Sequence, residues 1–144
     1  MQRRLLQELL KWKSSHRRKP LMLEGARQVG KTYLLEILFG NTYYDNVLRV
    51  NFEKADSELR NLFEGNIEPN RIINSLSMKE NKPFDPNRTL IIFDEIQEVP
   101  RALTSLKYFL EDAPEYHIAA TGSLLGVALH GGTSFPVGKV DRVR

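Results

Sequence analysis

Apolar residues are arranged in two ways along this chain, at helical spacing near the start and in short compact runs further on. The spacing near the start predicts an amphipathic helix over residues 2–13. Its apolar positions are Leu5, Leu6, Leu9, Leu10 and Trp12. The later runs predict strands at residues 21–23, 47–52, 89–94 and 116–121. The run 89–94 is the clearest, because a continuous apolar run is expected of a strand that is covered on both faces.

Capping residues and prolines predict helices between these strands. The helices are expected at residues 33–39, ended by Gly40, from Asp56 or Ser57 to Glu64, at residues 69–78, at residues 102–111 after Pro100, and at residues 124–129. Strands that alternate with helices predict right-handed crossovers, and hence an α/β fold: a three-layer sandwich with a mostly parallel sheet. Ligands of such sheets bind at the carboxyl ends of the strands.

Length and composition narrow the class of protein. A chain of 144 residues favours one domain, which we expect to span residues 1–144. The absence of cysteine excludes a disulfide framework, a thiolate zinc site and a cysteine nucleophile. No apolar run approaches the roughly 20 residues that a membrane helix needs, and polar residues interrupt the N-terminal apolar positions where a signal peptide would be continuous. We therefore expect a soluble, cytoplasmic protein with no membrane partner.

The net charge of +3 is concentrated at the N-terminus. The first 20 residues contain a single acid, Glu8, and the following basic residues: Arg3, Arg4, Lys11, Lys13, Arg17, Arg18 and Lys19. Two interpretations follow. The charges form the solvated face of the amphipathic helix, which is the more common case, or they bind nucleic acid.

A glycine-rich segment follows the first predicted strand and carries the most specific motif. It comprises Gly25, Ala26, Arg27, Gln28, Val29, Gly30, Lys31 and Thr32, which fit the pattern of glycine, four residues, then Gly-Lys-Ser/Thr. Backbone N–H groups of such a loop, and the start of the helix after it, converge on a phosphate chain. Lys31 is expected to reach the β- and γ-phosphates, and the Thr32 hydroxyl to bind Mg²⁺. The alternative is a strand-to-helix turn that binds no ligand.

Two acids end the clearest strand. Asp94 is placed to hold Mg²⁺ through water, opposite the phosphates. Glu95 can orient and deprotonate an attacking water molecule, which favours a nucleotide hydrolase over a kinase, because no second substrate pocket is indicated. The alternative role for this pair is helix capping.

Polar residues at two other strand ends give weaker predictions. Ser123, or its neighbour Thr121, is a candidate contact of the γ-phosphate or of the water molecule. Asn51 is a candidate partner that holds Glu95 when nucleotide is absent. Each of these residues is also a common turn former. The three histidines have no metal-ligand spacing: His16, His117 and His130.

Beyond these motifs, the chain resembles a prokaryotic AAA-type ATPase family whose members pair an N-terminal ATP-binding domain with a C-terminal domain of unknown function. The resemblance rests on residues 19–32, 92–100, 105–109 and 120–126, and above all on the strings Gly-Ala-Arg-Gln-Val-Gly-Lys-Thr and Asp-Glu-Ile-Gln-Glu. It implies a phosphate-loop ATPase core with the sheet order of the additional-strand catalytic-glutamate class, and with ATP and Mg²⁺ as ligands.

By position, the resemblance gives each matched residue a role. Lys31 and Thr32 become the phosphate and Mg²⁺ residues and Asp94 the second metal partner. Glu95 becomes the catalytic base and Ser123 the sensor. Asn51 matches the residue that some AAA-type enzymes use to hold the glutamate.

Family members continue beyond the point at which this chain ends, after a short fifth strand. The resemblance therefore implies that the helical lid, its sensor arginine and the C-terminal domain are missing, and it assigns no arginine finger. We expect Mg-ATP binding with slow turnover, and self-association by analogy with the family. Two alternatives are a nucleic-acid-binding module that uses nucleotide as a switch and a non-catalytic remnant.

Overall fold

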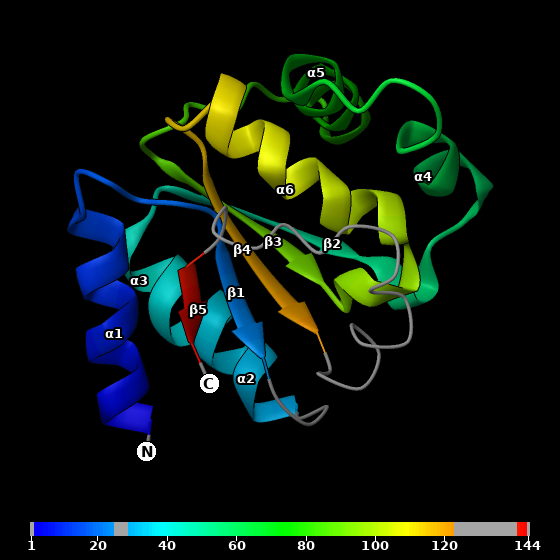
Figure 1. Cartoon of the computed structure of the whole chain (residues 1–144). Coiled ribbons are helices and arrows are strands. Elements are labelled where there is room, and N and C mark those ends of the chain that lie inside the picture. Colours follow the sequence, from blue (N-terminus) through cyan, green and yellow to red (C-terminus); the bar gives the residue numbers. More distant parts are fainter. Residues whose placement is uncertain (1, 25–28, 123–140, 144) are drawn as a thin grey trace.

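The computed structural model describes residues 2–24, 29–122 and 141–143, and its centre is a parallel sheet with helices on both faces (Figure 1). The strands are β1 (Leu21–Glu24), β2 (Asn46–Asn51), β3 (Thr89–Asp94), β4 (His117–Gly122) and β5 (Asp141–Val143). Their order across the sheet is β2-β3-β4-β1-β5, and every neighbouring pair is parallel. The predicted α/β fold with a mostly parallel sheet is confirmed, and all described strands end at the same edge.

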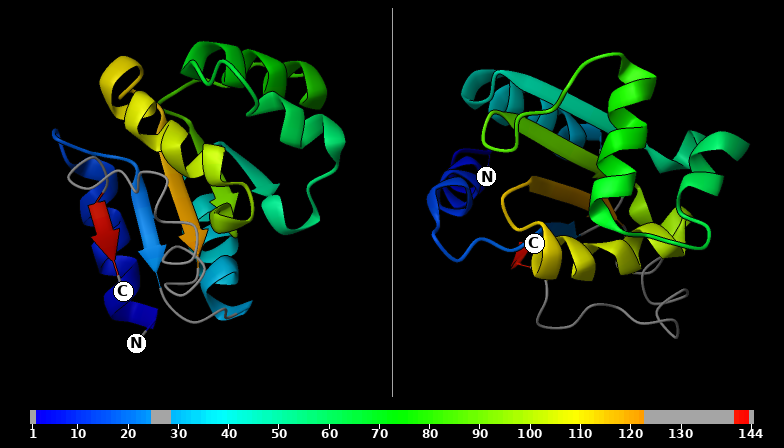
Figure 2. Two further views of the ribbon diagram at one scale, coloured as in Figure 1. Left: turned by 45° about the vertical axis from the view of Figure 1, so that its right-hand side comes forward. Right: turned by 90° about the horizontal axis from the view of Figure 1, so that it is seen from above.

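Helical segments form the two outer layers, as the views in Figures 1 and 2 show. One layer contains α1 (Gln2–Ser14), α2 (Val29–Tyr33), the π-helix η1 (Leu34–Gly40) and α3 (Asn41–Tyr43). The other contains α4 (Ser57–Leu62), α5 (Pro69–Glu80) and α6 (Pro100–Asp112). Two short 3₁₀ turns follow strand ends: η2 (Phe52–Lys54) and η3 (Ile96–Glu98). Within the described part of the chain, no helix is both long and apolar enough to cross a bilayer.

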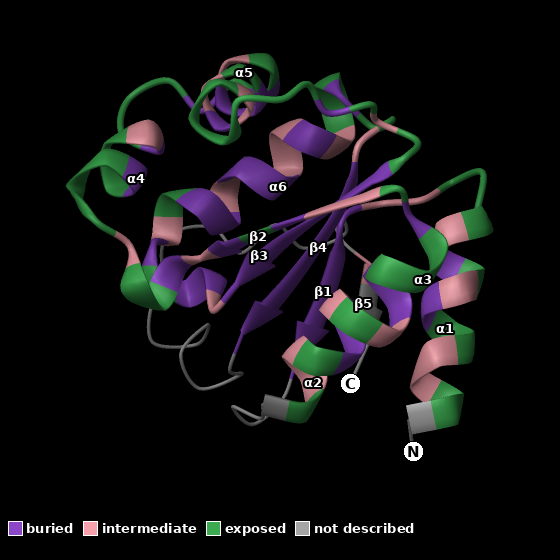
Figure 3. Cartoon of the chain, turned by 180° about the vertical axis from the view of Figure 1, so that it is seen from behind, coloured by how far each residue is buried: buried purple, intermediate pink, exposed green. Residues whose placement is uncertain are grey.

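The sheet is buried between two apolar clusters (Figure 3). β3 is buried along its whole length, which explains its continuous apolar run. Phe93 packs edge-on against three other rings on the α6 side, those of Phe52, Phe63 and Phe109, at centroid distances of 5.4, 6.0 and 6.1 Å. Edge-to-face packing of this kind holds rings in defined orientations. It therefore fixes the end of β3, where the two predicted acids lie.

The helix after the glycine-rich segment differs most from its prediction. Helical structure begins at Val29, before the expected start at Tyr33, and continues without a break through Gly40 to Tyr43. The prediction that Gly40 ends this helix is wrong, because its backbone is helical (φ −62°, ψ −57°). A Cβ at Gly40 would lie 2.8 Å from Cγ2 of Val47 and 3.0 Å from the carbonyl oxygen of Leu35. Glycine is needed here for close packing of the helix on the sheet.

The other predicted elements are present, with small shifts at their ends. Asp56 is the N-cap of α4, and its Oδ1 accepts a hydrogen bond from the N–H of Leu59 at 2.8 Å. α4 ends at Leu62, before the expected Glu64. β2 ends at Asn51, because Phe52 already belongs to the 3₁₀ turn. The predicted helix at residues 124–129 lies outside the described residues.

Candidate functional site

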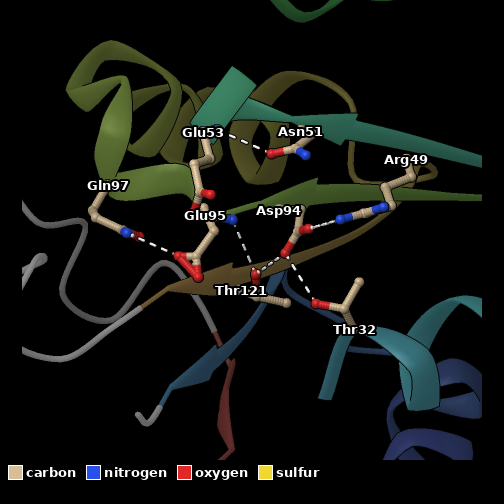
Figure 4. A network of polar contacts seen from close by, with 8 residues as sticks. All are labelled: Thr32, Arg49, Asn51, Glu53, Asp94, Glu95, Gln97 and Thr121. Carbon is tan, nitrogen blue, oxygen red and sulfur yellow. Dashed lines mark hydrogen bonds and ion pairs between the residues drawn. The ribbon is translucent and has the colours of Figure 1, made fainter. Parts of the chain in front are cut away.

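Polar side chains from separate strands and helices meet at the carboxyl edge of the sheet (Figure 4). Asp94 ends β3, and its side chain is only 4% exposed. Its Oδ1 accepts a hydrogen bond from the Thr121 hydroxyl of β4 at 2.6 Å and a second from the Thr32 hydroxyl of α2 at 3.3 Å. The structure therefore brings together the two residues that the sequence predicts as magnesium partners.

Lys31 lies on the first turn of the helical segment, close to the end of β1. Its Nζ donates a hydrogen bond to the main-chain oxygen of Glu24 at 2.7 Å. This carbonyl immediately precedes the predicted phosphate loop, so the ammonium group lies where β1 passes into that loop. A Cβ at Gly30 would meet no atom within 4 Å. The loop residues Gly25, Ala26, Arg27 and Gln28 lie outside the described residues.

Glu95 has a backbone conformation that is uncommon for a residue with a side chain. Its φ of 56° and ψ of 52° are left-handed, a region that costs of order 1–3 kcal/mol for a residue other than glycine. Thr121 supports this turn, because its Oγ1 accepts the N–H of Glu95 at 3.0 Å. The same hydroxyl thus connects Glu95 with Asp94.

The Glu95 carboxylate has a partner that the sequence analysis missed. Nε2 of Gln97, on the 3₁₀ turn η3, donates a hydrogen bond to Oε2 of Glu95 at 3.0 Å. Gln97 is only 6% exposed, so its amide is held in place. The predicted partner, Asn51, instead caps η2, because its Oδ1 accepts the N–H of Glu53 at 3.0 Å. Both arrangements are visible in Figure 4. Ser123 lies outside the described residues.

Arg49 is a second residue that the sequence analysis missed. Its Nε and Nη2 donate hydrogen bonds to Oδ2 of Asp94 at 3.0 and 2.5 Å. Alternation along β2 places Arg49 on the same face of the sheet as Asn51, while Leu48 and Val50 point into the core on the α6 side. A sequence shows this alternation, but it does not show that β2 lies beside β3.

The residues at this edge fit a magnesium ion. A carboxylate and a hydroxyl supply the hard oxygen ligands that Mg²⁺ prefers. Among the described residues, no group of three or more His, Cys, Asp or Glu could hold a metal ion. Mg²⁺ commonly binds through one or two protein groups together with water and substrate phosphates, so this small set of donors is sufficient.

The basic N-terminal segment is tied to the body of the chain. On α1, Leu9 and Trp12 are buried, whereas Arg3 and Arg4 are exposed, as expected for an amphipathic helix with a solvated face. Nη1 of Arg18 donates a hydrogen bond to the carbonyl oxygen of Lys13 at 3.1 Å, close to the end of α1. Part of the basic charge thus has an intramolecular role, and nucleic-acid binding stays a prediction.

Comparisons with known proteins give the family and the fold of the chain. Residues 17–144 match the family model of an AAA domain. The structure is similar to a Walker-type ATPase of Pyrococcus abyssi, with a TM-score of 0.56 and 20% identity, over 99% of this chain and 51% of that chain. The likeness shows a shared fold, and this chain spans about half the length of that protein. No curated protein matches the sequence.

Proposed function

Because the chain belongs to the AAA domain family, we propose that it binds ATP with Mg²⁺ at the carboxyl edge of the sheet and can hydrolyse it. The observation that carries this proposal is the meeting of Thr32, Asp94 and Thr121 beside Lys31. These residues come from three separate segments of the chain, and the fold brings their side chains together at one place.

Phosphate binding is proposed for the loop 25–32. Its backbone N–H groups and the start of the helix at Val29 would face the phosphate oxygens. The ammonium group of Lys31 can change its hydrogen-bond acceptor from the Glu24 carbonyl oxygen to a phosphate oxygen, because it is flexible and has three rotatable donors.

Metal binding is proposed for Thr32 and Asp94. Mg²⁺ would neutralise phosphate charge and help to position the phosphates. The Thr121 hydroxyl holds one oxygen of Asp94 and the backbone of Glu95 at once. It therefore fixes the relative position of the metal-binding acid and the proposed base.

Proton transfer is proposed for Glu95. Its carboxylate would accept a proton from the attacking water, and Gln97 would orient the carboxylate through the hydrogen bond to Oε2.

Ser123, at the first position after β4, keeps its proposed contact with the γ-phosphate or the water. Asn51 is proposed to fix the turn after β2 next to this base. We further propose that residues 1–144 form one ATP-binding core domain.

Replacement of Glu95 by Gln tests the proposed hydrolysis directly. We expect E95Q to bind ATP as the parent does and to lose about 10²-fold or more in the rate of phosphate release, because the general base is gone while the shape is kept. ATP binding is measured by fluorescence of an N-methylanthraniloyl-ATP probe, and turnover by release of labelled phosphate.

The matched control is E98Q, which removes an exposed carboxylate three residues away. It should leave both measurements unchanged. Equal turnover by the parent and E95Q would contradict the role of Glu95. Failure of the parent to bind the probe would contradict the proposed function as a whole.

A further inference from the structure

Both oxygens of Asp94 are occupied by protein groups, and one of these groups is a cation. Thr32 and Thr121 donate to Oδ1, while Arg49 donates twice to Oδ2 (Figure 4). A guanidinium group that donates two hydrogen bonds to a nearly buried carboxylate is a strong, oriented partner. The carboxylate proposed to bind Mg²⁺ is therefore already neutralised by the chain itself.

A magnesium ion at Asp94 would be repelled by this guanidinium. The ion carries two positive charges, and the guanidinium group of Arg49 carries one. Two cations that share one carboxylate in a partly buried site interact strongly and unfavourably. Either Arg49 moves away from Oδ2 when the metal binds, or the metal binds more weakly.

Arg49 is placed so that it can move. Its side chain is 35% exposed, whereas that of Asp94 is 4% exposed. It lies on β2, the edge strand of the described sheet, and borders a cavity of about 200 Å³ that is also lined by Lys54 and Glu80. The arginine can thus exchange the carboxylate for water without disturbing the buried strand β3.

We propose that Arg49 is an internal counter-ion of the magnesium site that competes with Mg²⁺ for Asp94. It keeps the buried carboxylate paired when no metal is bound, and it sets the magnesium concentration at which Mg-ATP binds. This inference rests on the proposed function, because it takes Asp94 as the metal partner. It differs from a plain structural ion pair, which would stabilise the fold without changing the metal dependence.

The test measures binding rather than turnover. The N-methylanthraniloyl-ATP probe is titrated with Mg²⁺ in the parent, in R49M and in R88M, which removes an equal charge from an exposed surface arginine. We expect R49M to lower the half-saturating Mg²⁺ concentration by about tenfold or more. R88M should stay within about twofold of the parent.

A second readout uses Mn²⁺ alone, without nucleotide, followed by electron paramagnetic resonance. R49M should bind Mn²⁺ about tenfold or more tightly than the parent, and the double variant R49M/D94N should lose this gain. This result would support the role of Arg49 even if the parent bound no ATP, in which case only the proposed function would fail.

A second replacement of Arg49, which still donates a hydrogen bond to Asp94, serves as a control in case R49M does not fold. R49Q is neutral and can still donate one hydrogen bond to the carboxylate, so it should show the same direction of change as R49M in both titrations. Thermal melting confirms that each variant is folded. If the folded variants need as much Mg²⁺ as the parent, or more, and gain no Mn²⁺ binding, the proposal is overturned.

Discussion

At the carboxyl edge of the sheet, Glu95 has a strained backbone that neighbouring side chains hold in place. Glu95 stays in a left-handed conformation although glycine would adopt it with less strain. Thr121 and Gln97 hold its backbone and its carboxylate. Strain of this kind persists where the surrounding structure enforces it, and it is common at functional sites. The strain at Glu95 therefore agrees with the role proposed for its side chain.

Gly30 provides a prediction at the same scale. In G30A the added methyl group meets no atom within 4 Å, and the backbone is helical, so stability should stay equal or rise by up to about 1 kcal/mol. ATP binding should weaken by about tenfold or more, because phosphate oxygens bound as proposed would approach the backbone at this glycine. Thermal melting and probe binding measure the two effects separately. Unchanged binding by G30A would show that no phosphate lies against this position.

The candidate site residues that can be chosen from the sequence belong to a motif or follow a long apolar run. Lys31, Thr32 and Asp94 could be predicted because their spacing and the apolar run before Asp94 restrict them strongly. Arg49 and Gln97 could not, because their roles depend on which strand lies beside which and on how one turn folds. Asn51 was predicted from its position at a strand end, whereas its side chain is used in the turn after that strand.

Among the elements, the helical segment from Val29 to Tyr43 shows the limit of glycine as a helix-end signal. A glycine after an apolar run usually indicates a C-cap, which is why Gly40 was predicted to end the helix. Here the same residue lets the helix approach β2 and β3, through Val47 and Leu90. Close packing and capping both favour glycine, and a single sequence does not distinguish them.

This packing leads to a prediction for G40A. A Cβ at this position would lie 2.8 Å from Cγ2 of Val47 and 3.0 Å from the carbonyl oxygen of Leu35, so the helix has to shift. We expect a loss of about 1–3 kcal/mol in the free energy of unfolding, as for other overpacked cores. Urea denaturation measures this loss. A stability equal to or above that of the parent would contradict the packing role and favour simple helix propensity, under which alanine stabilises.

At the scale of the whole molecule, a buried cluster of aromatic side chains connects α1 with β4 of the sheet. His117 of β4 is 4% exposed, and its Nδ1 lies 2.5 Å from the hydroxyl of Tyr44. Trp12 of α1 packs edge-on against the same imidazole at a centroid distance of 5.8 Å. Burial, together with the nearby charges of Arg18 and Lys13, lowers the pKa of His117 to about 4. The ring is therefore neutral near pH 7, with a structural role.

This shift predicts how stability depends on pH. The folded chain holds His117 neutral down to about pH 4, whereas the unfolded chain protonates it below about 6.5. The contribution of the neutral His117 ring to the free energy of unfolding is thus complete above about pH 6.5. It is lost as the pH falls towards 4, by at most about 1.4 kcal/mol per pH unit. The free energy of unfolding, measured by urea denaturation at several pH values in this range, should change less steeply with pH for H117Q than for the parent. Equal slopes would contradict the buried neutral imidazole.

Thermal melting of the chain with and without Mg-ATP, beside K31A, shows whether the proposed phosphate loop binds nucleotide. A ligand at 100 times its Kd that binds only the folded state adds about 2.7 kcal/mol. For a domain of this size, that gain raises Tm by about 5 °C or more. We expect such a rise for the parent and little or none for K31A. No rise at millimolar Mg-ATP, or an equal rise in both proteins, would contradict a phosphate-binding loop at residues 25–32.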